Sequence, residues 1–530
     1  MTEAQPQSSA QTPGAGIVRA ILSRASTPTA PALVGPGCGV TTYGDLDTQT
    51  ARIASALKRC GVRPGDRVAV VVQKSTDAFM LALGILRAGA ILVPLNTAYT
   101  SADVARFLSD AEPSLVVSDP KHAEAATAAS DGARRRVETL DASGGGSWAG
   151  LVHDALPLES DPDLHGQSPA VLLYTSGTTG PAKGALLTHG NLAHQARALM
   201  LAWSIRPSDV VLHALPLFHA HGLLIATLPA LWAGASLMFR YGFDADDAIS
   251  CLPSATCFMG VPFYYARLAA NRRLSASVTS AIRLFVSGSA PLPAVVRDRI
   301  LAQTGHVIAD RYGMTETLII AANRPDGHLR VGSVGVAVED VEIRITDIAG
   351  HAPVPVGTTG MVEVRGPNVC SGYWRNPDAT RSAFRSDGFF VTGDVGHLDA
   401  DGFLWLTGRA KDIIIYCGLN IHPGEVEAHL AELYGVSESA VFGVPHPEFG
   451  EAVVAAVVPE PGSRLVPHVV RGELVGRLAD YKVPKRVAVI EALPRNAMGK
   501  VDKGVLRERY ARLFTPGPDR APPAGPGDSR

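Results

Sequence analysis

Strand and helix patterns alternate in the N-terminal part of this 530-residue chain, which limits the folds that it can adopt. Residues 67–72 form a short apolar run typical of a buried strand, and residues 77–88 follow with the apolar spacing of a helix. Residues 91–95 return to a strand pattern, Ser101 is expected to cap a helix that reaches about residue 110, and 114–118 is a further strand. This β-α-β-α-β order predicts a doubly wound parallel sheet.

The hydrophobic pattern of the sequence changes after about Pro325. Short alternating runs divided by Gly, Pro and Asp predict a compact antiparallel β module over 341–346, 360–365, 388–392 and 403–406. A last α+β stretch has predicted helices at 423–433 and 467–478 and strands at 440–444, 452–459 and 486–490. We therefore predict an α/β protein with a large N-terminal domain of doubly wound sheets plus a β module, and a smaller, mobile α+β C-terminal domain.

The predicted boundaries follow from composition. We expect a disordered N-terminus over 1–16, a large domain over 17–410, a small mobile domain over 411–514 and a disordered Pro/Gly-rich tail over 515–530. Residues 130–150, which contain three consecutive glycines, are expected to form a long surface loop.

Charge and cysteine content exclude several classes of function. Forty-eight Lys and Arg residues nearly balance 50 Asp and Glu residues, so no basic face indicates a nucleic-acid partner. Six cysteines without a CxxC pair argue against a disulfide framework or a Cys-rich zinc module and fit a reducing cytoplasm. Residues 222–239 carry no charge, but Pro229 and Gly234 interrupt them. A buried helix followed by a buried strand is expected there, and no membrane span.

The most informative motif is the string YTSGTTGPAKG at residues 174–184. Small residues let backbone N–H groups approach a phosphate, hydroxyl groups add donors, and Lys183 supplies charge. The P-loop of NTPases requires G-x-x-x-x-G-K-[ST], which this string does not contain, and a strand pattern follows it in place of a helix. A phosphate-binding loop of another kind is therefore predicted.

This string resembles the phosphate loop of the adenylate-forming superfamily, which includes acyl-CoA synthetases, luciferases and the adenylation domains of peptide synthetases. The resemblance covers about residues 17–513. It also rests on RYGMTET at 311–317, DGFFVTGD at 387–394, TGRAKD at 407–412 and PRNAMGK at 494–500. Five motifs in the family's order make a chance match negligible.

The resemblance implies an ATP-dependent carboxylic acid–CoA ligase that forms an acyl-adenylate, with ATP, Mg²⁺ and coenzyme A as its small-molecule substrates and cofactor. Glu316 would ligate Mg²⁺, with Thr175 as a second metal ligand. The implied catalytic residues are Lys500, Lys183, His219, Thr315 and Glu316. The implied ATP/AMP-binding residues are Thr175, Ser176, Gly177, Thr178, Thr179, Gly180, Lys183, Ser289, Ala290, Arg311, Tyr312, Gly313, Met314, Thr315, Asp394, Arg409 and Lys500.

The chemistry explains these residue types. A carboxylate attacks the α-phosphate of ATP and expels pyrophosphate, so two anions must be brought together by cations and donors. Asp394 would accept the two ribose hydroxyls, and Lys500 would neutralise charge as pyrophosphate leaves. For the thiol step the family rotates its small domain about a hinge, here Lys411, and Gly418 and Leu419 would line the CoA passage.

Within the superfamily the sequence most resembles malonyl-CoA and methylmalonyl-CoA synthetases. This likeness rests on PLFHAHG at 216–222, MGVP at 259–262, RLFVSGSA at 283–290 and PRNAMGK. The second carboxylate of a diacid needs a cation, for which the arginine fork is well shaped. We expect that cation among Arg283, ranked first, Arg267 and Arg240, with His219 and His221 at the mouth of the pocket. A structural role is equally open for each arginine.

The sequence departs from the malonyl enzymes at residues 318–322, where LIIAA makes a more apolar wall. Methylmalonate, a medium-chain or aromatic acid, or oxalate therefore stay open as substrates. An acyl-AMP ligase that loads a carrier protein is a further alternative. A zinc site at His213, His219 and His221 is disfavoured because no Cys or acidic ligand accompanies them. Whether the chain is a monomer or a homodimer stays undetermined.

Overall fold

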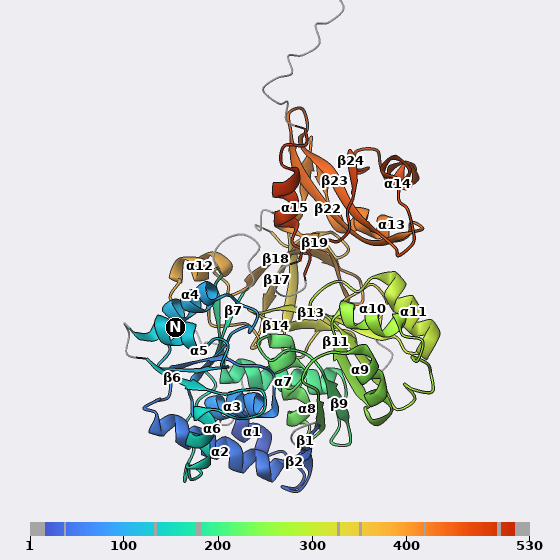
Figure 1. Ribbon diagram of the computed structural model, residues 1–530. Coiled ribbons are helices and arrows are strands. Elements are labelled where there is room, and N and C mark those ends of the chain that lie inside the picture. Colours follow the sequence, from blue (N-terminus) through green and yellow to red (C-terminus); the bar gives the residue numbers. More distant parts are fainter. Residues whose placement is uncertain are drawn as a thin grey trace, which may run out of the picture.

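Figure 1 shows a computed structural model in which a small C-terminal domain sits on one end of a large N-terminal domain. The described residues are 16–35, 39–131, 135–175, 182–325, 329–348, 352–417, 419–495 and 500–514. The predicted disordered segments at the two ends therefore lie outside the described residues, apart from Gly16.

One large sheet has the strand order β6-β5-β3-β4-β7-β8 and is parallel except for the β7–β8 hairpin. This confirms the predicted doubly wound sheet. Its core strands are almost wholly buried because helices pack on the sheet, as parallel sheets require. The strands are β3 (Arg67–Val71), β4 (Ile91–Pro94), β5 (Leu115–Ser118), β6 (Arg136–Thr139), β7 (Pro169–Tyr174) and β8 (Gly184–Thr188).

The second large sheet has the order β15-β14-β13-β12-β11-β9-β10-β1-β2 and is parallel through its centre, from β1 to β13. It is antiparallel at both edges. The strands are β1 (Pro31–Gly35), β2 (Gly39–Thr42), β9 (Val210–His213), β10 (Ser236–Phe239), β11 (Cys257–Gly260), β12 (Leu284–Ser287), β13 (Ile308–Met314), β14 (Leu318–Ala322) and β15 (Val336–Ala337).

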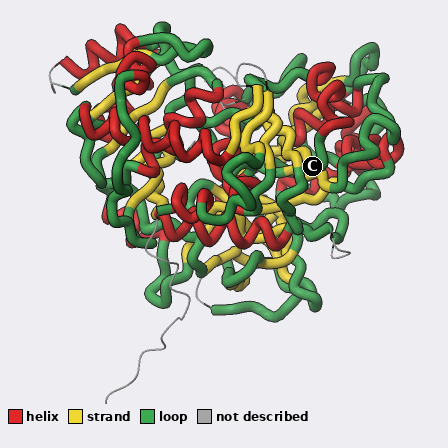
Figure 2. Tube along the Cα trace, turned by 90° about the horizontal axis from the view of Figure 1, so that it is seen from below, coloured by secondary structure: helices red, strands yellow, loops and turns green. Residues whose placement is uncertain are grey.

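Helices lie around the strands of the large domain in both views (Figures 1 and 2). They are α1 (Ile17–Leu22), α2 (Tyr43–Arg59), α3 (Thr76–Arg87), α4 (Ser101–Ala111), α5 (Ala123–Asp131), α6 (Ser147–His153), α7 (His189–Ala202), α8 (Leu228–Trp232), α9 (Ala245–Cys251), α10 (Pro262–Ala270), α11 (Ala294–Thr304) and α12 (Pro377–Ala383), with short turns η1 (His221–Ile225) and η2 (Leu252–Ser254). One apolar core runs between the two sheets.

Two local predictions were wrong. Residues 130–150 are not one surface loop, because they contain β6, which extends the first sheet beside β5, and the start of α6. The cap of α4 is Thr100 and not Ser101. The Thr100 hydroxyl accepts from the backbone N–H of Asp103, whose carboxylate accepts from the Thr100 N–H, so the helix starts one residue earlier.

The uncharged segment at residues 222–239 folds as predicted. A π-helical turn and α8 lead into β10, and nearly all of these residues are buried in the core. Among the described residues, no helix has the length and apolar character that a membrane crossing would need.

The predicted antiparallel module is a four-stranded sheet of β16 (Glu342–Thr346), β17 (Gly360–Arg365), β18 (Phe390–Leu398) and β19 (Leu404–Arg409). The turn η3 (Ala410–Asp412) connects it to the small domain, which has its own core. That domain holds β20 (Ile414–Tyr416), β21 (Leu419–Ile421), β22 (Val436–His446), β23 (Gly450–Pro459), β24 (Arg486–Val489), α13 (Pro423–Ala431), α14 (Pro467–Leu474) and α15 (Lys503–Tyr510).

Candidate active site

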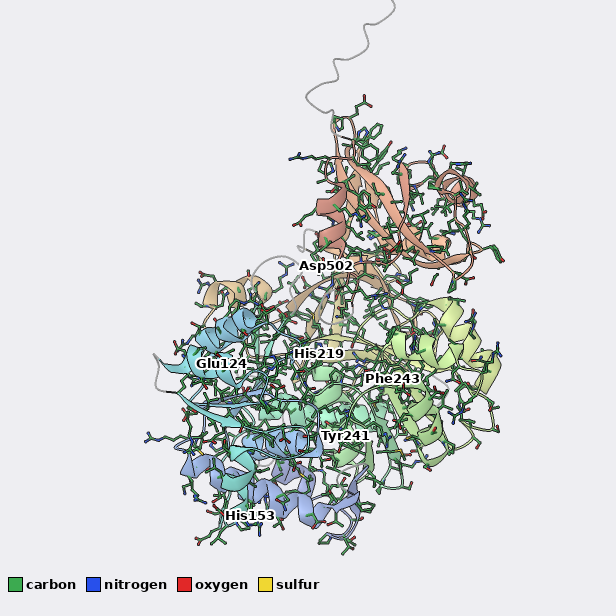
Figure 3. The ribbon with its side chains drawn as sticks, viewed as in Figure 1. Glu124, His153, His219, Tyr241, Phe243 and Asp502 are labelled. Atoms are coloured by element: carbon green, nitrogen blue, oxygen red, sulfur yellow. The ribbon has the colours of Figure 1, made fainter. Side chains whose placement is uncertain are left out.

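Polar side chains lie at or near the carboxyl ends of several parallel strands in the nine-stranded sheet. Strands β9, β10 and β12 end at His213, Phe239 and Ser287, and polar side chains follow each of them. In an open α/β sheet the crevice at the carboxyl ends is where ligands bind. Figure 3 shows His219 in this central region of the large domain and Asp502 at the junction with the small domain.

Asp394 lies on β18, and Tyr312 and Arg409 both contact its carboxylate. The Tyr312 hydroxyl donates to its Oδ2 at 2.6 Å, and Arg409 Nε lies 2.9 Å from its Oδ1. Burial raises the pKa of Asp394, while Arg409 and the Tyr312 hydrogen bond oppose that rise. The predicted Asp394–Arg409 pair is therefore present, and Tyr312 belongs to it through its hydroxyl group.

Glu316 is a buried carboxylate in the turn between β13 and β14. The Tyr373 hydroxyl donates to its Oε1 at 2.9 Å, and the Nζ atom of Lys183 lies 5.1 Å from the centre of the Tyr373 ring. Burial raises the pKa of Glu316, and the hydrogen bond from Tyr373 opposes that rise. The carboxylate of one motif and the lysine of another are thus brought together through one tyrosine.

The phosphate-loop prediction can be followed only at the two ends of the loop. The Thr175 N–H donates to the carbonyl of Lys183 at 2.9 Å, which closes the base of the loop where β7 ends and β8 begins. Ser176, Gly177, Thr178, Thr179 and Gly180 lie outside the described residues.

Arg311 on β13 is buried, with 7% of its surface exposed. Its Nε and Nη2 atoms have no hydrogen-bond partner within the described part of the chain. Gly288 leaves room for the guanidinium, because a Cβ at that position would lie 2.3 Å from Arg311 Nε. Burial lowers the pKa of Arg311 to about 10, so the group stays charged at neutral pH. An unpaired buried cation of this kind is costly unless an anion meets it.

Imidazoles gather beside Arg311. The Nδ1 atom of His221 lies 3.2 Å from Ser289 Oγ, and Ser289 adopts a positive φ of 73° just after β12. Burial, with Lys500 and other cations nearby, lowers the pKa of His219 to about 3 and that of His221 well below its usual value. Both imidazoles are therefore neutral, and their Nε2 atoms have no partner among the described residues.

Lys500 reaches this cluster from the small domain. Burial lowers its pKa first, followed by the cations Arg409 and Arg311, while Asp394 and Glu316 raise it. These influences place the Lys500 ammonium among the residues of the other motifs. Lys411, the predicted hinge, lies in η3 between the two domains, and burial together with Arg409 lowers its pKa.

Comparison with known proteins identifies the family. Residues 22–374 match the model of the AMP-binding enzyme family, and residues 425–500 match that of the AMP-binding enzyme C-terminal domain. The chain belongs to the AMP-binding enzyme family. It is 37% identical to feruloyl-CoA synthase from Amycolatopsis sp, over 88% of this chain and 94% of that protein. It is 32% identical to malonate–CoA ligase from Arabidopsis thaliana, over 88% and 81%.

Solved structures agree with this assignment. ATP-bound MatB from Rhodopseudomonas palustris superposes with a TM-score of 0.93 at 42% identity, over 95% of this chain and 100% of that one. The apo form of the same protein gives 0.82 at the same identity and coverage. The arrangement described here is therefore closer to the ATP-bound form. This AMP-binding enzyme is an ATP-dependent acyl-CoA ligase with the predicted fold and the predicted likeness to malonyl-CoA synthetases.

In this acyl-CoA ligase the setting of Arg283 differs from that of Arg311. Arg283 precedes β12 and so lies at the amino end of that strand, whereas Arg311 lies on β13 beyond the carboxyl end of β12. Its guanidinium forms a paired hydrogen bond to the Asp209 carboxylate and donates to the carbonyls of Trp203 and Ser204. These contacts favour a structural role for Arg283 over the predicted role at a substrate carboxylate, because its donors hold the ends of neighbouring elements together.

The other two candidate arginines of the ligase differ in setting. Arg240 follows the carboxyl end of β10 and pairs with the Asp247 carboxylate, which uses its Nε and Nη2 donors. Arg267 is exposed in the last turn of α10. Neither is buried and unpaired in the way that Arg311 is.

The remaining predicted residues of the ligase that the structure describes lie at the end of β13, just after β12 and on β21. Gly313 has no room for a side chain, because a Cβ would lie 1.8 Å from the Leu318 carbonyl. Met314 and Thr315 are half-buried at the β13–β14 turn, and Ala290 is exposed after β12. Leu419 is 48% exposed on β21, and Gly418 lies outside the described residues.

Sequence reasoning missed two residues that contact the candidate site. Tyr373 contacts Glu316 from 57 positions along the chain. Lys74, in the loop after β3, donates to the His213 carbonyl at 3.0 Å and covers the Phe239 ring, and burial lowers its pKa well below the usual value. No local pattern marks either residue, since each becomes part of the site only when distant strands are placed together.

Proposed function

We propose that this enzyme joins a short dicarboxylic acid, malonate or methylmalonate, to coenzyme A through an acyl-adenylate, with AMP and pyrophosphate as the other products. The observation that carries the proposal is the buried guanidinium of Arg311, whose Nε and Nη2 atoms lack partners among the described residues. We assigned Arg311 to the nucleotide from sequence, and we now propose that it binds the second carboxylate of the acid.

Three physical arguments support this role for Arg311. An arginine fork matches a carboxylate in geometry, and burial makes an unmet charge expensive. The neighbouring imidazoles are neutral, so they do not compete for the anion as cations would. The apolar segment Leu318–Ala322, which the sequence set against malonate, is β14, and its residues are buried within the main core.

For adenylate formation we propose the following division of roles. Arg311 and His221 orient the acid so that its reacting carboxylate faces the α-phosphate, with His219 beside it. Asp394 accepts the ribose hydroxyls, and Lys183 and the loop that begins at Thr175 bind the terminal phosphates. Lys500 neutralises the charge that develops as pyrophosphate leaves, because an oriented cation in a buried site costs no reorganisation.

The residues present fit magnesium as the metal. Within the described part of the chain no cluster of three His, Cys, Asp or Glu side chains could hold a metal by itself, so Glu316 would be the main protein ligand, with Thr175 as the second. A hard cation bound by few protein oxygens and several phosphate oxygens is typical of Mg²⁺. When bound, Mg²⁺ would neutralise phosphate charge.

For thioester formation we propose that the small domain rotates about Lys411. In the described pose Arg409, Arg311, Asp394 and Glu316 influence the pKa of Lys500, and Ile415 on β20 and Leu419 on β21 are exposed. Rotation would withdraw Lys500 and bring this hairpin toward the acyl-adenylate, so that one domain serves two half-reactions. Domain limits at 410 and 411 are part of this proposal.

Release of AMP tests the proposal directly. The purified enzyme is given ATP, Mg²⁺ and one acid at a time, with and without CoA: malonate, methylmalonate, oxalate, acetate, octanoate, benzoate and ferulate. CoA-dependent turnover confined to malonate and methylmalonate is expected.

An aromatic acid is the second candidate, because feruloyl-CoA synthase is 37% identical and the rings of Phe243 and Tyr264 stack at 3.8 Å beyond the end of β10. Turnover with ferulate or benzoate alone would retain the ligase activity and reject the diacid.

A further inference from the structure

Tyr373 joins two parts of the site that are far apart in the sequence. It follows the bend after β17, belongs to none of the motifs that indicated the family, and is half-buried. Its hydroxyl donates to Glu316 Oε1 at 2.9 Å, and its ring lies 5.1 Å from Lys183 Nζ, within the range of a cation–π contact. One side chain therefore contacts both the carboxylate that we assign to the metal and the lysine that we assign to the terminal phosphates.

The backbone around Tyr373 is fixed on both sides. The N–H groups of Leu186 and Trp374 donate to the carbonyls of Gly372 and Gly184, which binds residues 372–374 along the edge of β8. Strand β8 is the strand that leads out of the phosphate loop. In addition, the Tyr373 N–H donates to Thr380 Oγ1 at 3.0 Å. The position of the ring is thus tied to the base of the loop.

The same segment is also tied to Glu316 and to the first sheet. The Cys370 N–H donates to the Glu316 carbonyl at 2.7 Å. On the far side, Trp374 Nε1 donates to the Asp110 carbonyl at 3.1 Å, and the Asp110 carboxylate accepts the hydroxyl of Tyr174 at the end of β7. Residues 370–374 therefore form a bridge between the β13–β14 turn and the base of the phosphate loop.

We propose that Tyr373 is a positioning residue that couples metal binding to phosphate binding. Its hydroxyl holds one oxygen of Glu316 and leaves Oε2 for the metal, while its ring orients the Lys183 ammonium toward the phosphates. The inference rests on the proposed roles of Glu316 and Lys183. It assigns to Tyr373 the task of keeping those two groups at a fixed separation, because an outer residue that orients a ligating carboxylate strengthens metal binding.

The test is ATP binding by calorimetry at a series of Mg²⁺ concentrations, without acid or CoA, so that no turnover is needed. Tyr373→Phe keeps the ring and removes the hydroxyl. We expect the Mg²⁺ concentration for half-maximal ATP binding to rise about tenfold, with ATP binding in EDTA unchanged. Tyr373→Leu removes both contacts, so it should show the same rise and also weaken ATP binding in EDTA about threefold.

Trp374→Phe is the matched control, since it removes a side-chain hydrogen bond of the same bridge, from Trp374 Nε1 to the Asp110 carbonyl, without touching Glu316. It should leave the Mg²⁺ requirement unchanged. The proposal is overturned if Tyr373→Phe binds ATP with the wild-type Mg²⁺ requirement, or if Trp374→Phe shifts that requirement equally. Glu316→Gln distinguishes a failure of the proposed metal site from a failure of the role of Tyr373. If that variant keeps the wild-type Mg²⁺ requirement, the metal role of Glu316 is rejected. If Glu316→Gln raises the Mg²⁺ requirement but Tyr373→Phe does not, only the role of Tyr373 is rejected.

Discussion

Arg283, just before β12, and Arg311, on the neighbouring strand β13, lie toward opposite ends of one sheet. Arg283, at the amino end, has its guanidinium bound to one carboxylate and two carbonyls. Arg311, toward the carboxyl end, is more deeply buried and has two nitrogens without partners in the described chain. A satisfied arginine holds a fold together, whereas a buried and unsatisfied one is prepared for a ligand. The two residues are both arginines, so their hydrogen-bond partners and their burial, and not the residue type, distinguish them.

The carboxylates beside these arginines differ in the same way. Burial opposes the ionisation of Asp209, but hydrogen bonds from Arg283, Arg206 and Thr256 hold its pKa below the usual value. Burial raises the pKa of Asp310, next to Arg311, to about 7 because Arg297 and Arg311 only partly offset it. At the amino end of the strands the Asp209 carboxylate is therefore stabilised in its charged form, whereas toward the carboxyl end the Asp310 carboxylate is not.

The largest effect should come from removing Lys500, the cation that we propose moves with the small domain. Lys500→Ala should slow adenylate formation by about 10²–10³-fold, because one oriented charge is lost where negative charge develops. Thioester formation from supplied acyl-AMP should change little. Pyrophosphate release and CoA consumption measure the two steps separately. The control is Lys503→Ala, which removes a lysine of α15 that pairs with Glu427 of α13. Equal loss in both steps would contradict the proposed rotation.

Arg311→Met should separate diacids from monoacids. We expect KM for malonate to rise about 100-fold, since a buried charge-assisted hydrogen bond is lost, while KM for acetate changes less than about threefold. Steady-state kinetics with both acids checks this. If both acids suffer equally, Arg311 belongs to the nucleotide site, as the sequence first indicated.

Arg283→Met tests the other end of the sheet. It leaves Asp209, which is 3% exposed, as an unpaired buried charge, so the free energy of unfolding should fall by about 2 kcal/mol or more. The ratio of the KM values for malonate and acetate should stay at its wild-type value. Denaturant unfolding and the same kinetics are the measurements. A selective loss of malonate binding would restore Arg283 to the acid pocket.

The smallest effect should be a change in pH dependence from Asp310→Asn. Because the folded-state pKa of Asp310 is raised to about 7, the folded protein binds a proton more tightly than the unfolded chain. The stability that this group contributes is present below about pH 4 and is lost as the pH rises to about 7. The asparagine variant should lack this loss, of at least about 1 kcal/mol. Denaturant unfolding of both proteins at pH 5 and pH 8 measures how the free energy of unfolding changes with pH.

The fold and the reaction class could be predicted from the sequence, because both depend on local patterns. Strand and helix periodicity in residues 67–118 was sufficient for the parallel sheet, and the Asp394–Arg409 pair followed from two motifs that lie on adjacent strands of one antiparallel sheet. Prediction failed over residues 130–150, where β6 is a strand because β5 offers an open edge, a condition that no local pattern reveals.

The assembled fold was needed to show which arginine has nitrogens without partners among the described residues, and which side chain contacts both Glu316 and Lys183. Arg283 and Arg311 look alike in sequence, since each stands within or beside a short apolar strand. Their difference lies in partners such as Asp209 and Gly288, which come from distant segments. Hydrogen-bond satisfaction is a property of assembled elements, so it can be read only once strands far apart in the chain lie side by side.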